Sequence, residues 1–406
     1  MADVNPPRGM RDFLPADNLK RNLVQNVIRS SYIAHGYQEI ETPAMEDIAR
    51  LTSGQGGDNE KLAYRVMKRG EELESAIASG GDLADLGLRY DLTVPLTRYY
   101  ATNRSKLPNV FKAIQIGPVW RAERPQKGRY RQFVQCDIDI IGDASVLSEV
   151  DLLVSSLDAL AEIGINNAVI RINHRDLLNQ VLESLGIAPE NRSSAMITID
   201  KLDKVGIDGV TKELEEKFGA NSAQAAGEWL KGIVGELEVP ALLQPIFGAL
   251  EAKYANRLRF DPTLVRGMGY YTGAIFEIEH PESGASIGGG GRYDGMVGRW
   301  LGTDAPAVGI SLGFERVVDL VSEDFLGDRS VPGVVLVLDD DQPATLANAI
   351  ALRTQLLEHG HRVRLENRPK KLNLLLDSLA QNGFGQFATV SEQTKTLEDL
   401  NLRPVN

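Results

Sequence analysis

The sequence predicts mixed helices and strands in two parts, a large part at residues 1–330 and a small α/β domain at 331–406. Residues 110–141 form two alternating segments joined by a charged loop, which is typical of paired β-strands. A polar, helix-rich block at about 173–257 interrupts two strand-rich stretches, which indicates an inserted helical domain. After residue 331 strands and helices alternate, as in a parallel α/β domain.

The composition is that of an ordinary soluble protein. The 406 residues include 43% hydrophobic and 25% charged side chains, and we expect two or three domains. Neither a signal peptide nor a membrane span is visible, so we expect a cytoplasmic protein without membrane contact. The lone Cys136 excludes an internal disulfide and a cysteine-based metal site. With a net charge of −12, any RNA contact needs local basic patches.

The chain is expected to open with a helix at about residues 19–33, where apolar side chains follow helical spacing and Gly36 can end the helix. Residues 37–42 follow as a strand that stops at Pro43. Residues 61–87 are polar and predict a helix plus loop. Taken alone, the pattern of residues 19–42 is that of any amphipathic helix followed by a strand.

The two segments of 110–141 have an apolar and a polar face, because side chains alternate along a strand. The polar face carries Arg121, Glu123, Gln135 and Asp139. The loop between the strands, residues 124–131, is cationic. Such a floor and loop can hold a polyphosphate, with an aromatic ring such as Phe133 for stacking. The simpler alternative is an exposed hairpin with a basic turn.

Asp91 and Thr93 are expected to share a face of a short extended segment within residues 88–96. A carboxylate beside a hydroxyl can hold an ammonium group. The alternative is a helix N-cap, for which Asp and Thr are favoured residues.

Residues 264–278 predict a second strand region, in which three glycines indicate bends or close backbone approach. Arg266 stays charged and suits a place near a polyphosphate. In a regular strand Tyr270 and Tyr271 would point to opposite faces, so that only one could line a pocket. The alternative is a strand with core tyrosines.

Two further stretches complete the larger part. The glycine run at 288–291 adjoins Arg292, Tyr293 and Asp294, which favours a strand whose backbone lies against a ligand over a flexible linker. Residues 307–316 predict a strand, a turn and a helix that carries Arg316. Taken alone, Arg316 is an ordinary surface helix residue.

The C-terminal part predicts strands at 334–338, 362–365 and 387–390, with helices at 343–357 and 372–379. A possible RNA-binding patch consists of Arg362, Arg364, Arg368, Lys370 and Lys371. The acidic run 339–341 opposes it.

Together these stretches resemble the class II aminoacyl-tRNA synthetases, and specifically the histidyl-tRNA synthetase family. Residues 124–133, R-P-Q-K-G-R-Y-R-Q-F, match that family's form of motif 2. Residues 266–273 resemble its R-G-x-x-Y-Y-T-G signature, with Gly269 where the family more often has Asp. The glycine run resembles its second histidine signature. Residues 307–316 resemble motif 3, and the first helix with its strand and Pro43 resembles motif 1, a dimer interface.

The resemblance implies an α+β class II catalytic core, an antiparallel sheet flanked by helices. It also implies a helical insertion near the tRNA acceptor arm and a C-terminal anticodon-binding-like domain. The implied reaction activates histidine with ATP and transfers it to tRNA(His). Magnesium is expected with the ATP, bound largely through its phosphates, and the chain is expected to form a homodimer.

The resemblance also implies the residues of the site. Arg121 and Arg266 would be catalytic and hold the α-phosphate and carboxylate oxygens. The ATP-binding set would be Arg121, Glu123, Arg129, Phe133 and Arg316. The histidine-binding set would be Asp91, Leu92, Thr93, Gln135, Asp139, Arg266, Tyr270, Tyr271 and Tyr293. No metal-ligand residues are expected in the chain itself.

Two alternatives belong to other classes. A synthetase-like paralogue serves as regulatory subunit of the ATP phosphoribosyltransferase of histidine biosynthesis, but such paralogues lack parts of the ATP site. Here a C-terminal domain is expected and the residues that matter are all present, which favours the enzyme: Arg121, Glu123, Arg129, Arg266 and Arg316. The short C-terminal domain also leaves open an amino-acid-activating enzyme that does not use tRNA.

Overall fold

The computed structural model describes residues 4–53, 57–126, 128–235, 237–266, 270–322, 325 and 332–405. The chain divides into two compact units, Met1–Arg11 with Asn26–Val321 and Asp12–Gln25 with Ser322–Asn406. The division between Gln25 and Asn26 falls inside helix α1 (Pro15–Ala34). The predicted domain boundary at 330/331 lies outside the described residues. Among the described residues, no helix is long and apolar enough to cross a membrane.

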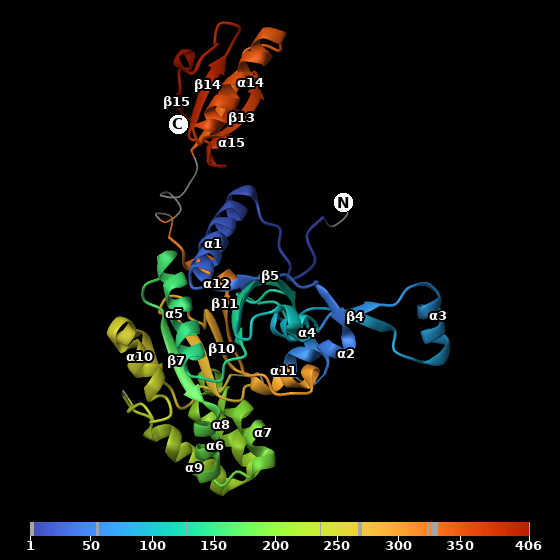
Figure 1. Ribbon diagram of the computed structural model, residues 1–406, viewed down its shortest axis with the longest axis vertical. Coiled ribbons are helices and arrows are strands. Elements are labelled where there is room, and N and C mark those ends of the chain that lie inside the picture. Colours follow the sequence, from blue (N-terminus) through green and yellow to red (C-terminus); the bar gives the residue numbers. More distant parts are fainter. Residues whose placement is uncertain are drawn as a thin grey trace. The chain divides into compact units, whose positions relative to one another are not determined.

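The larger unit is built on one eight-stranded sheet of order β1-β5-β6-β11-β10-β9-β7-β8 (Figure 1). Its strands are β1 Gln38–Glu39, β5 Phe111–Trp120, β6 Gln132–Ile141, β7 Val169–His174, β8 Leu258–Phe260, β9 Ala274–Glu279, β10 Gly288–Arg292 and β11 Ala307–Gly313. The strands from β5 to β7 in that order pair antiparallel. The short edge strands β1 and β8 pair parallel to their neighbours. The predicted α+β core is therefore confirmed, with a sheet that is antiparallel in its interior.

The predicted strand pair is the hairpin of β5 and β6. Ile114, Cys136 and Ile138 are fully buried on its apolar face, as the alternation predicts. The prediction for the end of the first strand is wrong, because β5 stops at Trp120 and Arg121 and Glu123 lie beyond it. Backbone hydrogen bonding between the two segments nevertheless continues beyond β5, since the Arg121 amide donates to the Arg131 carbonyl oxygen at 2.9 Å.

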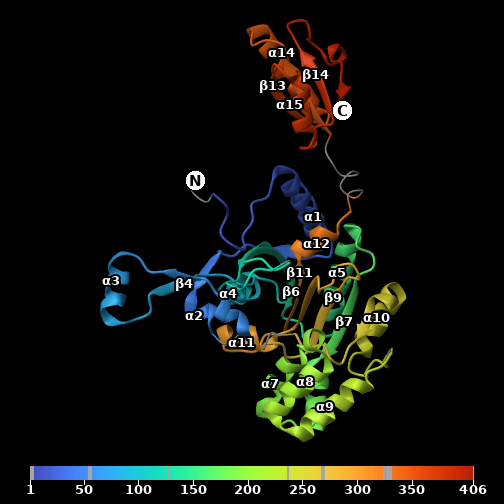
Figure 2. The same ribbon diagram turned by 180° about the vertical axis from the view of Figure 1, so that it is seen from behind.

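Helices surround this sheet. Near the predicted motifs they are α2 Ile48–Leu51, α4 Thr93–Asn103, α5 Leu147–Glu162, α11 Asp294–Leu301 and α12 Phe314–Leu320. Between β7 and β8 the chain forms the predicted helical block, α6 Arg175–Ser184, α7 Arg192–Ile199, α8 Leu202–Phe218, α9 Ala220–Gly232 and α10 Gln244–Tyr254. Helices α7, α8 and α9 gather at one end of the sheet in both ribbon views (Figures 1 and 2).

The stretch predicted as a helix plus loop at 61–87 does contain a helix, but it also forms two strands of a small sheet. Its strands are β2 Met45–Asp47, β3 Arg65–Met67 and β4 Ala84–Leu88, and helix α3 (Gly70–Ser79) connects the last two. The strands are short and carry few apolar residues, so their alternation is weak. Gly87 allows close packing here, since a Cβ on it would lie 2.9 Å from the Leu51 side chain.

The smaller unit contains a four-stranded sheet of order β13-β12-β14-β15. Its elements are β12 Gly333–Leu338, α14 Pro343–Glu358, β13 Arg362–Asn367, α15 Leu372–Ala380, β14 Gln386–Val390 and β15 Arg403–Pro404. β12 pairs parallel with both neighbours. Its alternate residues enter two separate cores, one with α14 and one with α15. This burial on both faces explains the continuous apolar run, and the predicted α/β domain is confirmed.

Candidate active site

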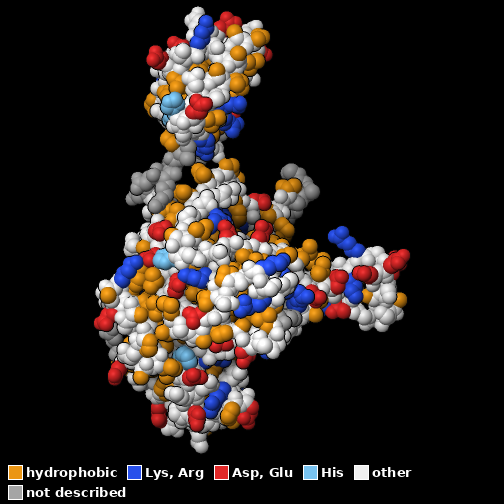
Figure 3. Space-filling model, in the orientation of Figure 1, with side chains coloured by type: hydrophobic (Ala, Val, Ile, Leu, Met, Phe, Trp, Pro, Cys, Tyr) orange, Lys and Arg blue, Asp and Glu red, His pale blue; other side chains and the backbone are white. Residues whose placement is uncertain are grey.

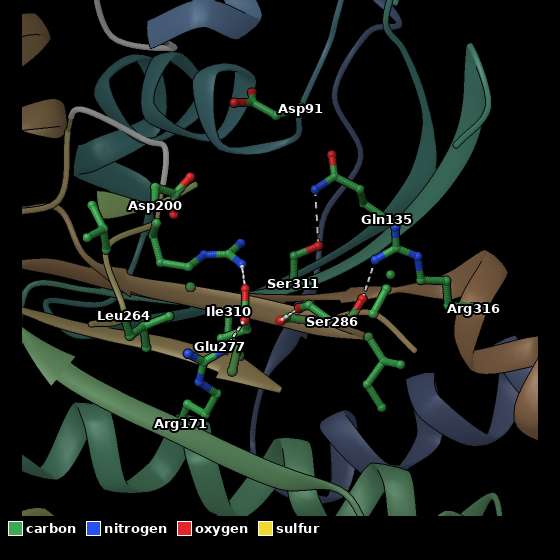
Figure 4. A pocket seen from close by; sticks show the side chains of 18 of the residues that line it. Asp91, Gln135, Arg171, Asp200, Leu264, Glu277, Ser286, Ile310, Ser311 and Arg316 are labelled. Atoms are coloured by element: carbon green, nitrogen blue, oxygen red, sulfur yellow. Dashed lines mark hydrogen bonds and ion pairs between the residues drawn. The ribbon is translucent and has the colours of Figure 1, made fainter. Parts of the chain in front are cut away.

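The larger unit contains a cavity of about 830 Å³ above the middle of its sheet (Figure 4). It brings together residues from separate segments of the chain. Of the predicted site residues, those that line it are Asp91, Thr93, Arg121, Glu123, Arg129, Phe133, Gln135, Asp139, Arg266, Tyr270, Tyr271, Tyr293 and Arg316. Leu92 does not line it. Its side chain is buried and its carbonyl oxygen accepts a hydrogen bond from Gln115.

Strand β6 supplies the acidic floor. Its period of two sends Gln135, Asp137 and Asp139 into the cavity while Cys136 and Ile138 enter the core. Asp139 accepts a hydrogen bond from the Tyr293 hydroxyl at 2.5 Å. Burial raises the pKa of Asp139 to about 7. This carboxyl is therefore poised to change its charge near neutral pH.

Asp91 both caps a helix and lines the cavity. The predicted extended segment is wrong, because α4 begins at Thr93. Asp91 Oδ1 accepts from the Val94 amide at 3.0 Å, so the capping alternative applies to this oxygen. Within the part of the chain that the structure describes, Asp91 Oδ2 is buried without a hydrogen-bond partner. Burial raises the pKa of Asp91 to about 6.

Asp137 is a third carboxyl in the cavity, and sequence reasoning did not assign it to the site. It is 3% exposed, and burial followed by the charge of Asp139 raises its pKa well above the ordinary value. The signal that could have found it is its place between Gln135 and Asp139 on the same face of one strand.

The positive charge of the cavity is supplied by arginines from the β5–β6 loop and from α12. Burial and the nearby Arg129 guanidinium lower the pKa of Arg316. Arg316 donates to the Ser286 carbonyl oxygen, and Arg129 contacts Glu123 at 3.4 Å. Two neighbouring guanidinium groups at a cavity wall suit a ligand with several negative charges.

Arg121 lies between the acidic floor and this cationic wall. Its Nε donates to the Tyr90 carbonyl oxygen at 2.9 Å. Its guanidinium carbon is 5.1 Å from the centroid of the Phe133 ring. It also faces the floor electrostatically, since its charge acts to lower the pKa of Asp91 and of Asp137.

Arg266 enters the cavity from an irregular segment rather than from the predicted strand, since β9 begins only at Ala274. Its φ of 59° is left-handed, a conformation that non-glycine residues rarely adopt. Its Nη1 donates to Glu277 at 2.7 Å. Gly289 makes room for it, because a Cβ there would lie 2.7 Å from Arg266 Cζ. The glycine run thus packs against a protein cation.

The expectation that only one of the paired tyrosines can line a pocket is also wrong. Tyr270 and Tyr271 both line the cavity, with ring centroids 4.8 Å apart in an edge-on arrangement. They precede β9, so strand alternation does not separate them. Gly291 accommodates the second ring, because a Cβ on it would lie 2.8 Å from Tyr271 Cδ1. The unusual Gly269 lies outside the described residues.

Sequence reasoning also missed a buried ion-pair chain beneath Arg266. Glu277 on β9 contacts Arg171 on β7 at 3.1 Å, and Arg171 also pairs with Asp261. Asp200, which follows α7, lines the cavity from the helical block. No local pattern marks these residues, since their partners are distant in sequence. Among the described residues, no group of three or more His, Cys, Asp or Glu is arranged to hold a metal ion.

Comparisons with known proteins agree with this geometry. The family model described as Histidyl-tRNA synthetase matches residues 9–317. A relative from Leifsonia xyli subsp. xyli, named histidine–tRNA ligase, is 50% identical over 99% of this chain and 98% of its own. The crystal structure of histidyl-tRNA synthetase from Nostoc sp. PCC 7120 has a TM-score of 0.72 and 25% identity, covering 96% of this chain and 91% of that one.

The same fold occurs in a Bacillus halodurans structure described as an ATP phosphoribosyltransferase regulatory subunit/histidyl-tRNA synthetase. Its TM-score is 0.73 at 19% identity, with coverage of 95% of this chain and 97% of that one. At this identity the likeness concerns the fold alone.

Proposed function

Since this chain belongs to the histidyl-tRNA synthetase family, we propose that it is a histidine–tRNA ligase. It activates histidine with ATP to histidyl-adenylate and transfers the histidyl group to the 3′ end of tRNA(His). The reaction is that of an aminoacyl-tRNA ligase and produces AMP and diphosphate.

One observation carries the proposal, namely the charge arrangement of the cavity. Its floor holds Asp91, Asp137 and Asp139, and its wall holds Arg129 and Arg316. A ligand with an ammonium group and N–H donors fits the floor, and a polyphosphate fits the wall. Histidine has the ammonium group and the N–H donors, and ATP has the polyphosphate.

On the ATP side, Arg129 and Arg316 would hold the outer phosphates. Glu123 would accept the adenine amino group and Phe133 would stack on the ring. Magnesium would enter with ATP and be held chiefly by phosphate oxygens, because Mg²⁺ keeps few protein ligands in nucleotide sites.

On the histidine side, Asp91 and Thr93 would hold the α-amino group, with Gln135 beside it. Asp139 and Tyr271 would hold the imidazole, and Tyr270 and Tyr293 would support them. The Asp139 carboxylate accepts hydrogen bonds but cannot satisfy a neutral aliphatic side chain, so it favours a ring N–H over an apolar substrate.

The two catalytic arginines act at the junction of the substrates. A carboxylate oxygen of histidine attacks the α-phosphorus, the new acyl–phosphate bond forms, and diphosphate leaves. Negative charge grows on the α-phosphate oxygens, where Arg121 and Arg266 would stabilise it. A ribose hydroxyl of the tRNA then attacks the histidyl carbonyl carbon, and AMP departs.

For the smaller unit we propose a role in binding the anticodon arm of tRNA(His). Lys and Arg side chains gather at one end of this unit in the space-filling view (Figure 3). Two of its predicted contact residues also form internal ion pairs, Arg368 with Asp339 and Arg364 with Glu366. These pairs reduce the charge available to RNA. We further propose a homodimer that works in the cytoplasm, where tRNA is charged.

ATP–diphosphate exchange and tRNA charging, measured side by side, test the function. We expect exchange with histidine alone among the amino acids, and charging of tRNA(His). No exchange with any amino acid would favour the regulatory-subunit alternative. Exchange without charging would favour an activating enzyme that does not use tRNA.

A further inference from the structure

The acidic floor contains three buried acceptor atoms without hydrogen-bond partners within the described chain. They are Asp91 Oδ2, Gln135 Oε1 and Asp137 Oδ1, and all three residues line the cavity. Buried polar atoms are normally hydrogen-bonded. Asp91 Oδ2 and Gln135 Oε1 therefore indicate a ligand with several N–H donors, as an ammonium group has.

Gln135 is the member of this group whose orientation needs an explanation. A primary amide presents an acceptor at one end and donors at the other, and only the acceptor end suits an ammonium. In the structure Gln135 Nε2 donates to Ser311 Oγ at 3.0 Å, with its oxygen turned away from Ser311 (Figure 4). The neighbour of Ser311 therefore decides which end of the amide faces the cavity.

That neighbour is Asp137, which lies directly opposite Ser311 in the β6–β11 register and lines the same cavity, so that the two side chains share one face of the sheet. An ionised carboxylate only accepts hydrogen bonds, so the single Ser311 proton must point to Asp137. The Ser311 oxygen is then left to accept from the Gln135 amide nitrogen. The chain of donors runs from Gln135 through Ser311 to Asp137.

We propose that Asp137 and Ser311 are positioning residues, which hold the Gln135 carbonyl oxygen toward the substrate ammonium and so make the site selective for ligands that carry one. This inference rests on the proposed function, because histidine must occupy the cavity. It assigns Asp137 a role through Gln135 rather than a direct contact with substrate.

The charges that face Asp137 change when a substrate binds. In the empty cavity burial, and after it the charges of Asp139 and Asp91, disfavour the ionised form of Asp137, whereas Arg121 favours it. An arriving ammonium adds a second positive charge near the floor. Substrate binding therefore favours the ionised state of Asp137, in which the relay has only one polarity.

Replacement of Asp137 by Asn tests the relay, because an Asn amide can donate to Ser311. Because Asn also has an acceptor oxygen, the polarity of the relay is then no longer fixed, and in the reversed polarity Ser311 donates to Gln135 Oε1 and the Gln135 NH₂ group faces the ammonium. Calorimetry on the full-length protein would compare L-histidine with imidazolepropionate, which lacks the amino group. We expect Asp137→Asn to weaken histidine by about 10- to 100-fold, the effect of a hydrogen bond to a charged group, and to change imidazolepropionate by less than about 3-fold.

A double-mutant cycle with Ser311→Ala separates relay from direct contact. If the relay operates, Asp137→Asn adds little to the loss already caused by Ser311→Ala. Additive losses would overturn the inference, since they would mean that Asp137 acts on the ammonium independently of Ser311. Equal weakening of both ligands would also overturn it, as a general structural defect.

Two controls complete the design. Asp85→Asn makes the same chemical change at an exposed position of β4, and we expect it to leave both affinities unchanged. Thermal unfolding should place Asp137→Asn at or above the wild type, because Asn removes the cost of ionising a buried carboxyl group. A large drop in melting temperature would favour the structural role. Failure of the folded wild type to bind histidine would instead refute the proposed function itself.

Discussion

Replacement of Gly309 by alanine gives a selective test of the histidine end of the cavity. Gly309 lies opposite Asp139 in the β6–β11 register. A Cβ there would lie 1.9 Å from Asp139 Oδ1, and contacts under 3.0 Å are essentially never found. The nearest backbone atom, the Ile138 carbonyl oxygen, is 3.3 Å away. The main displacement therefore falls on the Asp139 carboxylate, which must move by about 1.1 Å.

This movement is large enough to break the 2.5 Å hydrogen bond between the Tyr293 hydroxyl and Asp139. It also takes the carboxylate away from the proposed imidazole position. A hydrogen bond to a charged group contributes about 1.5–3 kcal/mol. Loss of the proposed hydrogen bond between Asp139 and the imidazole N–H therefore corresponds to a decrease in histidine affinity of about 10- to 150-fold. The three atoms nearest to the added Cβ belong to Asp139 and Ile138 and not to the arginines of the ATP wall, so ATP affinity should change by less than about 3-fold.

The assay is ATP–diphosphate exchange with histidine and ATP varied separately. The control is Gly295→Ala on α11, where an added Cβ meets nothing within 4 Å. We expect wild-type values for the control and a raised KM for histidine alone in Gly309→Ala. An unchanged histidine KM, or equal weakening of both substrates, would refute the assignment of Asp139 to the imidazole.

Three more expectations concern other parts of the site. Arg266→Ala should lower the single-turnover rate of adenylate formation by about 10²-fold or more with little change in ATP affinity; an unchanged rate would remove Arg266 from the chemistry. Asp139→Asn should raise the KM for histidine and flatten its pH dependence. The wild type should bind histidine less tightly as pH falls through about 7, the pKa of Asp139, because the carboxyl then gains a proton. A chain lacking residues 331–406 should retain histidine-dependent exchange and lose tRNA charging, provided that sedimentation shows an unchanged oligomeric state; equal charging would deny this domain a role with tRNA.

Where the backbone is regular, the sequence predicted which side chains face the cavity. Strand β6 keeps its alternation over its whole length, so Gln135 and Asp139 face the cavity as expected. The same pattern contained Asp137, but alternation alone did not distinguish a functional carboxyl from a structural one. The direction of each side chain on β6 was therefore predictable from the sequence, but the role of Asp137 was not.

Where the backbone leaves regular geometry, the predicted local structure was wrong, although the residues line the cavity as expected. Arg266 is left-handed and the paired tyrosines precede β9, so no period of two applies to them. Asp91 occupies a turn before α4, where one oxygen caps the helix and the other faces the cavity. Arg171 and Asp200 come from distant segments and only the fold brings them to the site.

The acidic floor also bears on how selectivity and stability are linked. Burial raises the pKa of Asp91 to about 6 and that of Asp139 to about 7, so ionising either group in the empty cavity costs folding stability. A raised folded-state pKa gives a stability contribution that is present at low pH and lost as pH rises through these values. A ligand that brings an ammonium and a ring N–H offsets this loss, since it supplies the missing positive charge and donors. The ligand-free enzyme should therefore gain more thermal stability from histidine at pH 8 than at pH 6, and a ligand without the ammonium should reproduce only part of that gain.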